Sequence, residues 1–355
     1  MSDTTSGFVC AHHHLYSSLA RGMPAPPQSP VDFISTLRQI WWRLDAALDL
    51  DIIKWSAALG AAEAALSGTT AIIDHHESPN AIEGSLDAIA QGCALVGVRL
   101  VAAYGITDRW NDVGEAVEVT PSTSVSSSAK RGLEECKRFI RAGGRGMVGV
   151  HASFTCGNDT LAAAAEMADE LGVGVHIHVA EGPDDADAAD RLASIAKDNW
   201  LLVHCVGLRD ALPGTIVHNP RSNMNNSVGY ARPARFPNRV ALGTDGIGAD
   251  MPEEFRIAYV AGRAESIDFS PDTAWSWIAT GEDLVPEVRN DVVRWNYDNM
   301  GSPWHLAFTP GTRPLDVTID GREILKDGLV IGFDHDEIKA KATEQAKRLH
   351  ERLAA

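Results

Sequence analysis

The sequence has few cysteines, no two of them in a CxxC spacing, and no apolar run long enough to cross a bilayer. The five cysteines are scattered and odd in number. This argues against a disulfide framework or a thiolate metal site and favours a cytoplasmic protein. A membrane-spanning helix needs about 20 consecutive apolar residues, and no stretch of this sequence approaches that length.

Positive charge is scarce as well. The 355 residues include 48 Asp and Glu against 31 Lys and Arg, which gives a formal net charge of −17. Because nucleic acids and most membrane surfaces are anionic, this balance argues against both as partners. The chain is 45% hydrophobic and long enough for one large domain with an appendage.

Short β-branched apolar runs recur along the chain, separated by Ala-rich segments with helical spacing. Continuous apolar runs are typical of parallel strands buried on both faces. Eight such runs predict the α/β class and a closed (β/α)8 TIM-type barrel, with an open doubly wound sheet as the alternative. The predicted strands are 8–12, 70–74, 98–104, 147–151, 173–179, 200–204, 215–218 and 240–244.

Two segments depart from this repeat. Residues 21–50 form an insertion after the first predicted strand, and we expect it to cover the mouth of the barrel. Residues 315–333 contain two Asp-Gly pairs between short apolar runs, which is a hairpin signal. We therefore expect the barrel over residues 7–300, and a small β appendage with a C-terminal helix over residues 301–355.

Histidines and carboxylates gather where the predicted strands end. In a (β/α)8 barrel the carboxyl ends of the strands form the catalytic face. Ten of the 13 histidines would meet there, which is more than ordinary core histidines explain. The polar residues at these ends are His12, His13, His14, Asp74, His75, His76, His151, His176, His178, Glu181, His204, His218, Asn219 and Asp245.

This gathering predicts a metal site. Alternate residues of a strand face the same side, so His12 and His14 are expected to point together. A catalytic zinc ion takes about three protein ligands and a water molecule, and Asp245 could add a carboxylate oxygen to the imidazoles. The absence of thiolates argues against a purely structural site, and this donor set suits Zn²⁺ or Fe²⁺.

The ordered motifs resemble the amidohydrolase superfamily, and more closely its deaminase and chlorohydrolase branch. That branch includes guanine deaminase, S-adenosylhomocysteine deaminase, triazine hydrolases and related aminohydrolases. The resemblance covers about residues 8–260 and continues more weakly to 353. The motifs are HxH at 12–14, DHHESP at 74–79, HVAE at 178–181, the histidine at 204, HNPRSNMNNSVG at 218–229 and GTDG at 243–246.

The resemblance implies a role for each of these residues. Glu181 would pass a proton to a ring nitrogen of the substrate, His204 would orient the attacking water, and Asp245 would accept the water's proton. No lysine lies between residues 146 and 156, where binuclear members carry a carboxylated lysine, so one metal ion is expected. Zn²⁺ is favoured and Fe²⁺ is the alternative, and the implied ligands are His12, His14, His178 and Asp245.

Other residues are candidates for substrate contacts, and each also has an ordinary structural interpretation. Asn219 could bind a heterocycle or build a turn, and Arg21 could reach a substrate or pair with a surface acid. The full set of candidates is His151, Asn219, Arg21, His75, His76 and Tyr16.

Members of this branch carry several dozen residues of β-sandwich before the HxH strand, whereas eleven residues precede His12 here. The strands within 315–333 resemble the returning half of that sandwich. We therefore expect the appendage to be a reduced β-sandwich. Its exposed edges could be covered by a homodimer contact or by the terminal helix.

These observations predict a metal-dependent enzyme that acts on non-peptide C–N bonds. The expected reaction is the hydrolytic deamination of an aminated nitrogen heterocycle of purine, pyrimidine or triazine type. Hydrolysis of a cyclic amide or of a carbon–halogen bond on the same scaffold is the alternative. A lyase or isomerase that uses the metal ion as a Lewis acid, and a barrel that binds ligands without turnover, belong to different classes.

Overall fold

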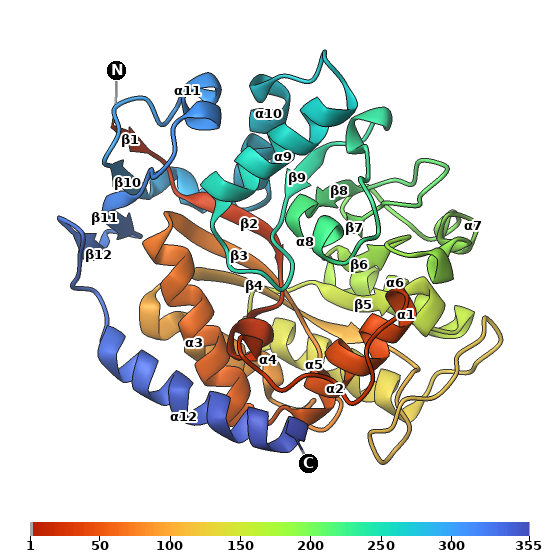
Figure 1. The fold of residues 1–355 in the computed structure, drawn as a ribbon. Helices are drawn as coiled ribbons and strands as arrows, with labels where there is room; N and C mark the ends of the chain where they lie inside the picture. The colour runs from red at the N-terminus through yellow and green to blue at the C-terminus, as the bar shows by residue number, and fades with distance from the viewer. Residues whose placement is uncertain (1–2, 355) are drawn as a thin grey trace.

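The computed structural model describes residues 3–354 and confirms the predicted barrel (Figure 1). Eight parallel strands pair in sequence order from β2 to β9. The ring closes between its first and last strands, where the backbone N–H groups of Thr244 and Asp245 donate to the carbonyl of His12 at 3.0 and 3.1 Å. The strands are β2 (Phe8–His13), β3 (Thr69–His76), β4 (Arg99–Ile106), β5 (Val148–Ala152), β6 (Val175–Val179), β7 (Leu201–His204), β8 (Thr215–His218) and β9 (Val240–Leu242).

Helices surround the strands, as the alternating pattern predicts. The Ala-rich helix α3 packs closely against α4, because small side chains and Gly92 let the two helix backbones approach. The segment between β7 and β8 is too short for a full helix and contains none. The helices of the barrel are α3 (Leu50–Leu66), α4 (Ser85–Val96), α5 (Ser127–Arg141), α6 (Asn158–Leu171), α7 (Ala188–Leu192), α8 (Pro220–Asn225), α9 (Met251–Glu265) and α10 (Pro271–Leu284).

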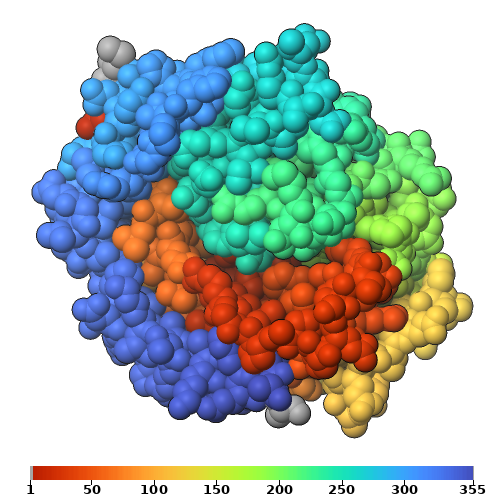
Figure 2. All heavy atoms as spheres, in the orientation of Figure 1, coloured from red at the N-terminus to blue at the C-terminus, as the bar shows by residue number. Residues whose placement is uncertain are grey.

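The insertion after β2 folds into short helices that lie across one face of the molecule (Figure 2, orange-red). They are α1 (Phe33–Thr36), a π-helical turn (Leu37–Trp41) and α2 (Trp42–Ala47). Phe33, Leu37 and Trp42 bury their side chains together with Trp110, which follows β4. This small cluster fastens the insertion to the barrel, in the position expected of a cover.

A five-stranded antiparallel sheet forms the appendage, with the strand order β1-β10-β11-β12-β13. Two of its strands, β1 and β10, precede the segment 301–355 in the chain. They join the sheet only when the chain folds. Residue 355 of that segment lies outside the described residues. The strands are β1 (Thr4–Thr5), β10 (Val292–Trp295), β11 (Pro314–Ile319), β12 (Arg322–Lys326) and β13 (Leu329–Val330).

The chain continues through α11 (Pro303–Phe308) before this sheet and ends in α12 (His335–Ala354) after it. The terminal helix runs along α3 and reaches the insertion. There Arg348 and Arg352 donate to the Asp49 carboxylate at 2.7 and 2.5 Å. The end of the chain therefore supports the cover of the barrel.

All five cysteines are buried with free thiols. Between residues 3 and 354, no helix combines the length and the apolar character that crossing a bilayer requires. The cytoplasmic location and the homodimer contact expected from the sequence stay predictions.

Replacement of Gly92 by alanine tests the close packing of α3 on α4. Alanine normally favours a helix over glycine by up to about 1 kcal/mol. Here the new Cβ would lie 2.4 Å from the Lys54 carbonyl oxygen and 2.8 Å from the Ala57 Cβ. We expect Gly92→Ala to lower the free energy of unfolding by about 1–3 kcal/mol, measured by urea denaturation. Gly301→Ala, whose Cβ would meet no atom within 4 Å, should leave it unchanged.

Candidate active site

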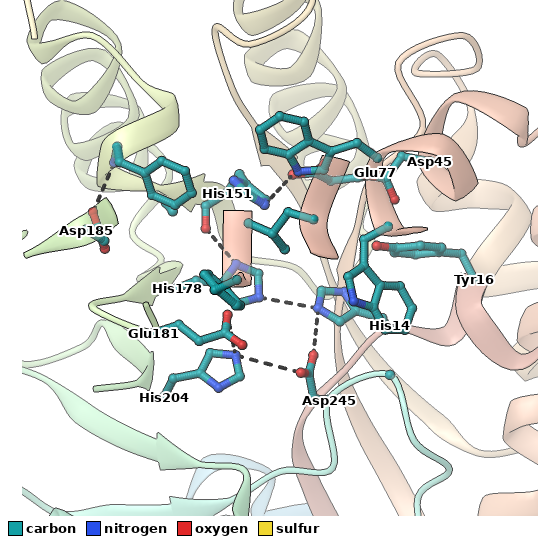
Figure 3. Close-up of a pocket in the computed structure, with 17 residues that line it drawn as sticks. His14, Tyr16, Asp45, Glu77, His151, His178, Glu181, Asp185, His204 and Asp245 are labelled. Atoms are coloured by element: carbon teal, nitrogen blue, oxygen red, sulfur yellow. Dashed lines mark hydrogen bonds and ion pairs between the residues drawn. The ribbon is translucent and has the colours of Figure 1, made fainter. Parts of the chain in front are cut away.

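The predicted metal-binding side chains meet at the carboxyl end of the barrel (Figure 3). His14 Nε2 lies 2.9 Å and His12 Nε2 lies 3.3 Å from Asp245 Oδ1. His14 Nε2 also lies 3.3 Å from His178 Nε2. The structure therefore brings together all four residues that the resemblance implies as ligands, although they come from β2, β6 and the end of β9.

Glu181 and His204, the other two residues with an expected catalytic role, lie beside this cluster. His204 Nε2 is 3.4 Å from Glu181 Oε2 and 3.8 Å from Asp245 Oδ2. Asn226 donates to the other Glu181 oxygen at 3.3 Å. Burial raises the pKa of Glu181, so this carboxyl group is favoured in its protonated, proton-donating form.

Local backbone geometry turns these side chains inward. His204 and Asp245 have φ angles of 69° and 56°, in the left-handed region that residues other than glycine rarely occupy. Each lies at or just after the end of its strand, where the chain must turn without carrying the side chain away from the barrel axis. Backbone strain of this kind typically collects at functional sites.

The donor set fits a single divalent metal ion. His12, His178, His204 and Asp245 each offer one ligand atom, and these atoms lie within 4.8 Å of one another. Three imidazoles and one carboxylate without a thiolate are typical of a catalytic zinc or iron site. In this closest set His204 stands where the sequence predicts His14, and the assignment of the four ligands stays a prediction.

Hydrogen bonds behind the imidazoles fix which nitrogen faces the centre. His14 Nδ1 donates to the His75 carbonyl at 2.5 Å, and His178 Nδ1 donates to the His151 carbonyl at 2.6 Å. Nε2 of each ring is then free to bind a metal ion. Burial also lowers the pKa of His178 well below its usual value, which keeps this imidazole in the neutral form that ligation requires.

His12 is held differently from the other two imidazoles. With Nε2 turned to the centre, its Nδ1 donates to Nε2 of a second imidazole, His176, at 2.9 Å. His176 is completely buried and lies behind His12, as expected of a residue that is not itself a ligand. The ring of His75 packs edge-on against His176 at 5.0 Å between centroids.

A pocket opens over the cluster. Its lining includes His14, His178, Glu181, His204 and Asp245, together with residues of the insertion and of the segment after β5. Two predicted substrate contacts, Tyr16 and His151, line it. Apolar side chains form most of the remaining wall, namely Phe33, Leu37, Trp41, Trp42, Ala152 and Phe154.

Four other predicted substrate contacts are not among the described residues that line the pocket. The Arg21 side chain is 64% exposed and pairs with Glu63 at 2.6 Å. Asn219 is fully buried at the start of α8. The Arg21 side chain therefore lies on the outer surface, and Asn219 is enclosed at the start of α8. Their roles as substrate contacts stay predictions.

His75 and His76 are also displaced from the pocket, since both are fully buried within β3. The His75 ring lies 4.6 Å from that of His178, and its Nε2 donates to the Val150 carbonyl at 3.2 Å. His76 bonds Ser78 and packs against Tyr16 at 5.3 Å. Both residues contact pocket side chains, His178 and Tyr16 respectively, and their own contact with substrate stays a prediction.

A buried ion cluster beside the pocket was missed from the sequence. Arg109, 1% exposed, donates to Asp45 Oδ2 at 2.9 Å and to Glu77 Oε1 at 3.1 Å. Its guanidinium lies about 5 Å from the rings of Trp42 and Trp110. The only available signal was a polar TDR run directly after a buried strand, which does not identify the partners.

A closed eight-stranded barrel with imidazoles and a carboxylate gathered at its carboxyl end defines the class of metal-dependent barrel hydrolases. Comparison with known proteins places the chain within that class. Residues 4–278 match the Amidohydrolase family, and the chain belongs to it. The resemblance drawn from the motifs is thereby confirmed, as is the expectation of a hydrolase of non-peptide C–N bonds.

Similar proteins include several deaminases. A 5'-deoxyadenosine deaminase of Methanopyrus kandleri is 30% identical over 388 residues, which cover 97% of this chain and 86% of that protein. A 5-methylthioadenosine/S-adenosylhomocysteine deaminase of Syntrophomonas wolfei is 27% identical over 399 residues, with the same coverage of 97% and 86%.

Solved structures confirm the fold. A zinc-bound adenosine deaminase from Xanthomonas campestris superposes with a TM-score of 0.77 at 19% identity, covering 98% of this chain and 86% of that one. An atrazine chlorohydrolase from Arthrobacter aurescens, complexed with zinc, gives 0.74 at 19% identity, with 97% and 88% covered.

Substitution of His176 tests whether it positions His12 for metal binding. His176→Leu fills the space but removes the acceptor of the His12 Nδ1 proton. We expect metal affinity to fall about 10–100-fold, measured by competition with a chromophoric chelator. His176→Gln, which can place an oxygen near the same point, should retain most of the affinity. Equal affinities for the leucine variant and the wild type would show that His176 has only a packing role.

Proposed function

We propose that this hydrolase uses one divalent metal ion to deaminate an aminated nitrogen heterocycle. The observation that carries this proposal is the row Glu181–His204–Asp245, with contacts of 3.4 and 3.8 Å, along the floor of a pocket walled by aromatic rings. A planar ring between those walls would present its amine-bearing carbon to a water molecule on one side and a ring nitrogen to Glu181.

The metal ion would be held by His12, His14, His178 and Asp245, and we propose zinc because the zinc-bound proteins named above share this fold. When bound, such an ion acts as a Lewis acid that makes a water molecule nucleophilic near neutral pH.

Protein groups then move the protons. Asp245 accepts one from the attacking water, and its Oδ2 is oriented by a hydrogen bond from the Ser222 hydroxyl. His204 orients the attacking water, and its own ring is oriented by a hydrogen bond from Nδ1 to Asn223 Oδ1 at 2.7 Å. Protonated Glu181 gives its proton to the ring nitrogen next to the carbon under attack.

Departure of the amine completes the reaction. The amino group takes up the proton that Asp245 accepted, the C–N bond breaks, and ammonia leaves. The hydroxyl on the ring carbon gives its remaining proton back to Glu181, and the ring carbon keeps the oxygen as a carbonyl. The relatives named as adenosine-type deaminases make purines the first substrates to test. Pyrimidines and triazines have the same amidine unit, an amino-bearing carbon beside a ring nitrogen.

The test is ammonia release by the zinc-loaded protein from a panel of aminopurines, aminopyrimidines and aminotriazines. Chloride release from a chlorotriazine, and ring opening of a cyclic amide, are measured in parallel. Ammonia from at least one ring supports deamination. Chloride or a ring-opened product alone would assign one of the alternative hydrolyses, and no turnover of the whole panel would contradict the proposal.

Glu181→Gln tests the proton transfer. The amide keeps the size of the side chain but cannot donate a carboxyl proton, so we expect kcat to fall by about 10²–10⁴-fold. Metal content, measured by elemental analysis, should not change because Glu181 is not an expected ligand. Glu166→Gln, an exposed position on α6, serves as the matched control. Full activity of the Glu181→Gln variant would contradict the proposal that Glu181 donates the proton.

A further inference from the structure

The pocket wall is unusual in its charge. Among the described residues that line it, no side chain is a lysine or an arginine, whereas five carry carboxylates. Two of the five, Glu181 and Asp245, belong to the proposed chemistry. The other three also line the pocket, and they are Asp45, Glu77 and Asp185.

The nearest buried cation is already engaged. Arg109 bonds both Asp45 and Glu77, and the Trp42 and Trp110 rings lie about 5 Å from its guanidinium. Since two carboxylates share one guanidinium, the three side chains together have a formal charge of −1. Arg109 is 1% exposed and does not line the pocket. Its charge therefore offers little attraction to an anion bound there.

Other candidate cations do not alter this balance. Arg38 is exposed and stacks over Trp42 at 6.0 Å, in a groove separate from the pocket. His151 lines the wall, and its Nδ1 is already engaged in a hydrogen bond with the Thr155 hydroxyl at 2.8 Å. Asp185 accepts hydrogen bonds from Ser153 and from two backbone N–H groups, which stabilise it as an anion.

We propose that the site accepts rings whose other substituents are neutral or cationic and rejects rings that carry a carboxylate or phosphate. Away from the metal ion, an anionic substituent would lose its hydration in the pocket without gaining a cationic side chain as a partner, and it would face carboxylates instead. This inference rests on the proposed function and makes it more specific. It favours a neutral 5'-deoxyadenosine over S-adenosylhomocysteine, whose tail ends in a carboxylate.

Three adenosine derivatives of similar size test the inference. They are 5'-methylthioadenosine with a neutral tail, 5'-amino-5'-deoxyadenosine with a cationic tail, and adenosine 5'-monophosphate with an anionic one. Dissociation constants from calorimetry, with the zinc-loaded Glu181→Gln variant to prevent turnover, are compared with kcat/KM of the wild type. We expect the first two ligands to agree within about tenfold and the third to be at least about a hundredfold weaker.

The outcomes separate the two proposals. If adenosine 5'-monophosphate binds as tightly as 5'-methylthioadenosine, the charge selectivity is overturned while deamination is left intact. Selective binding without ammonia release from any ring in the panel would overturn deamination while leaving the selectivity intact. If none of the three adenosine derivatives binds, the comparison moves to aminotriazines with ethyl, aminoethyl or carboxymethyl side chains. If the carboxymethyl compound does not bind more weakly than the other two, the inference is also overturned.

A cation placed in the wall should weaken the preference. Trp41 lines the pocket and is partly exposed, so Trp41→Lys can be accommodated, and Trp41→Gln is its neutral control. We expect the ratio of anionic to neutral ligand affinity to rise about tenfold in the lysine variant over the glutamine variant. The gain should shrink at high salt. An unchanged ratio in correctly folded variants, judged by their thermal melting, would contradict an electrostatic cause.

Discussion

The convergence of imidazole nitrogens on the Asp245 carboxylate is the interaction on which the rest of the structure depends. A carboxylate buried in a barrel is costly unless cationic or hydrogen-bonding partners surround it. The backbone that closes the barrel also brings these partners together, because Thr244 and Asp245 donate to the carbonyl of His12. Closure of the sheet and assembly of the metal site are therefore one structural event.

The abundance of histidine follows from the need to hold these groups in place. His14 and His178 use backbone carbonyls to orient their rings, whereas His12 uses the imidazole of His176. His75 fills the space beneath them without reaching the pocket. A close-packed interior of this kind keeps the ligand nitrogens in position before any ion is bound, which favours catalysis by a preorganised site.

The insertion after β2 supplies what the barrel itself lacks, namely an apolar wall and its charge. Trp42 and Asp45 reach Arg109 from this insertion, and α12 supports it from outside through Asp49. The part of the pocket that would select the substrate is thus built largely from a segment outside the strands that carry the expected metal ligands. This arrangement is typical of barrels whose loops carry specificity.

The family resemblance of the motifs supplied the expected ligand set and the roles of Glu181 and His204, while the sequence by itself determined the eight strands, the barrel and the gathering of histidines and carboxylates at the strand ends. These depend on local apolar runs and on polar residues at strand ends, which spacing along the chain reveals. Only the tertiary structure decided that Arg21 faces solvent, that Asn219, His75 and His76 are fully buried, and that β10 joins the appendage. It alone paired Arg109 with Asp45 and Glu77. Strand spacing gives the end at which a side chain lies but not its depth in the packed layers, and ion pairs between distant segments form only when the chain folds.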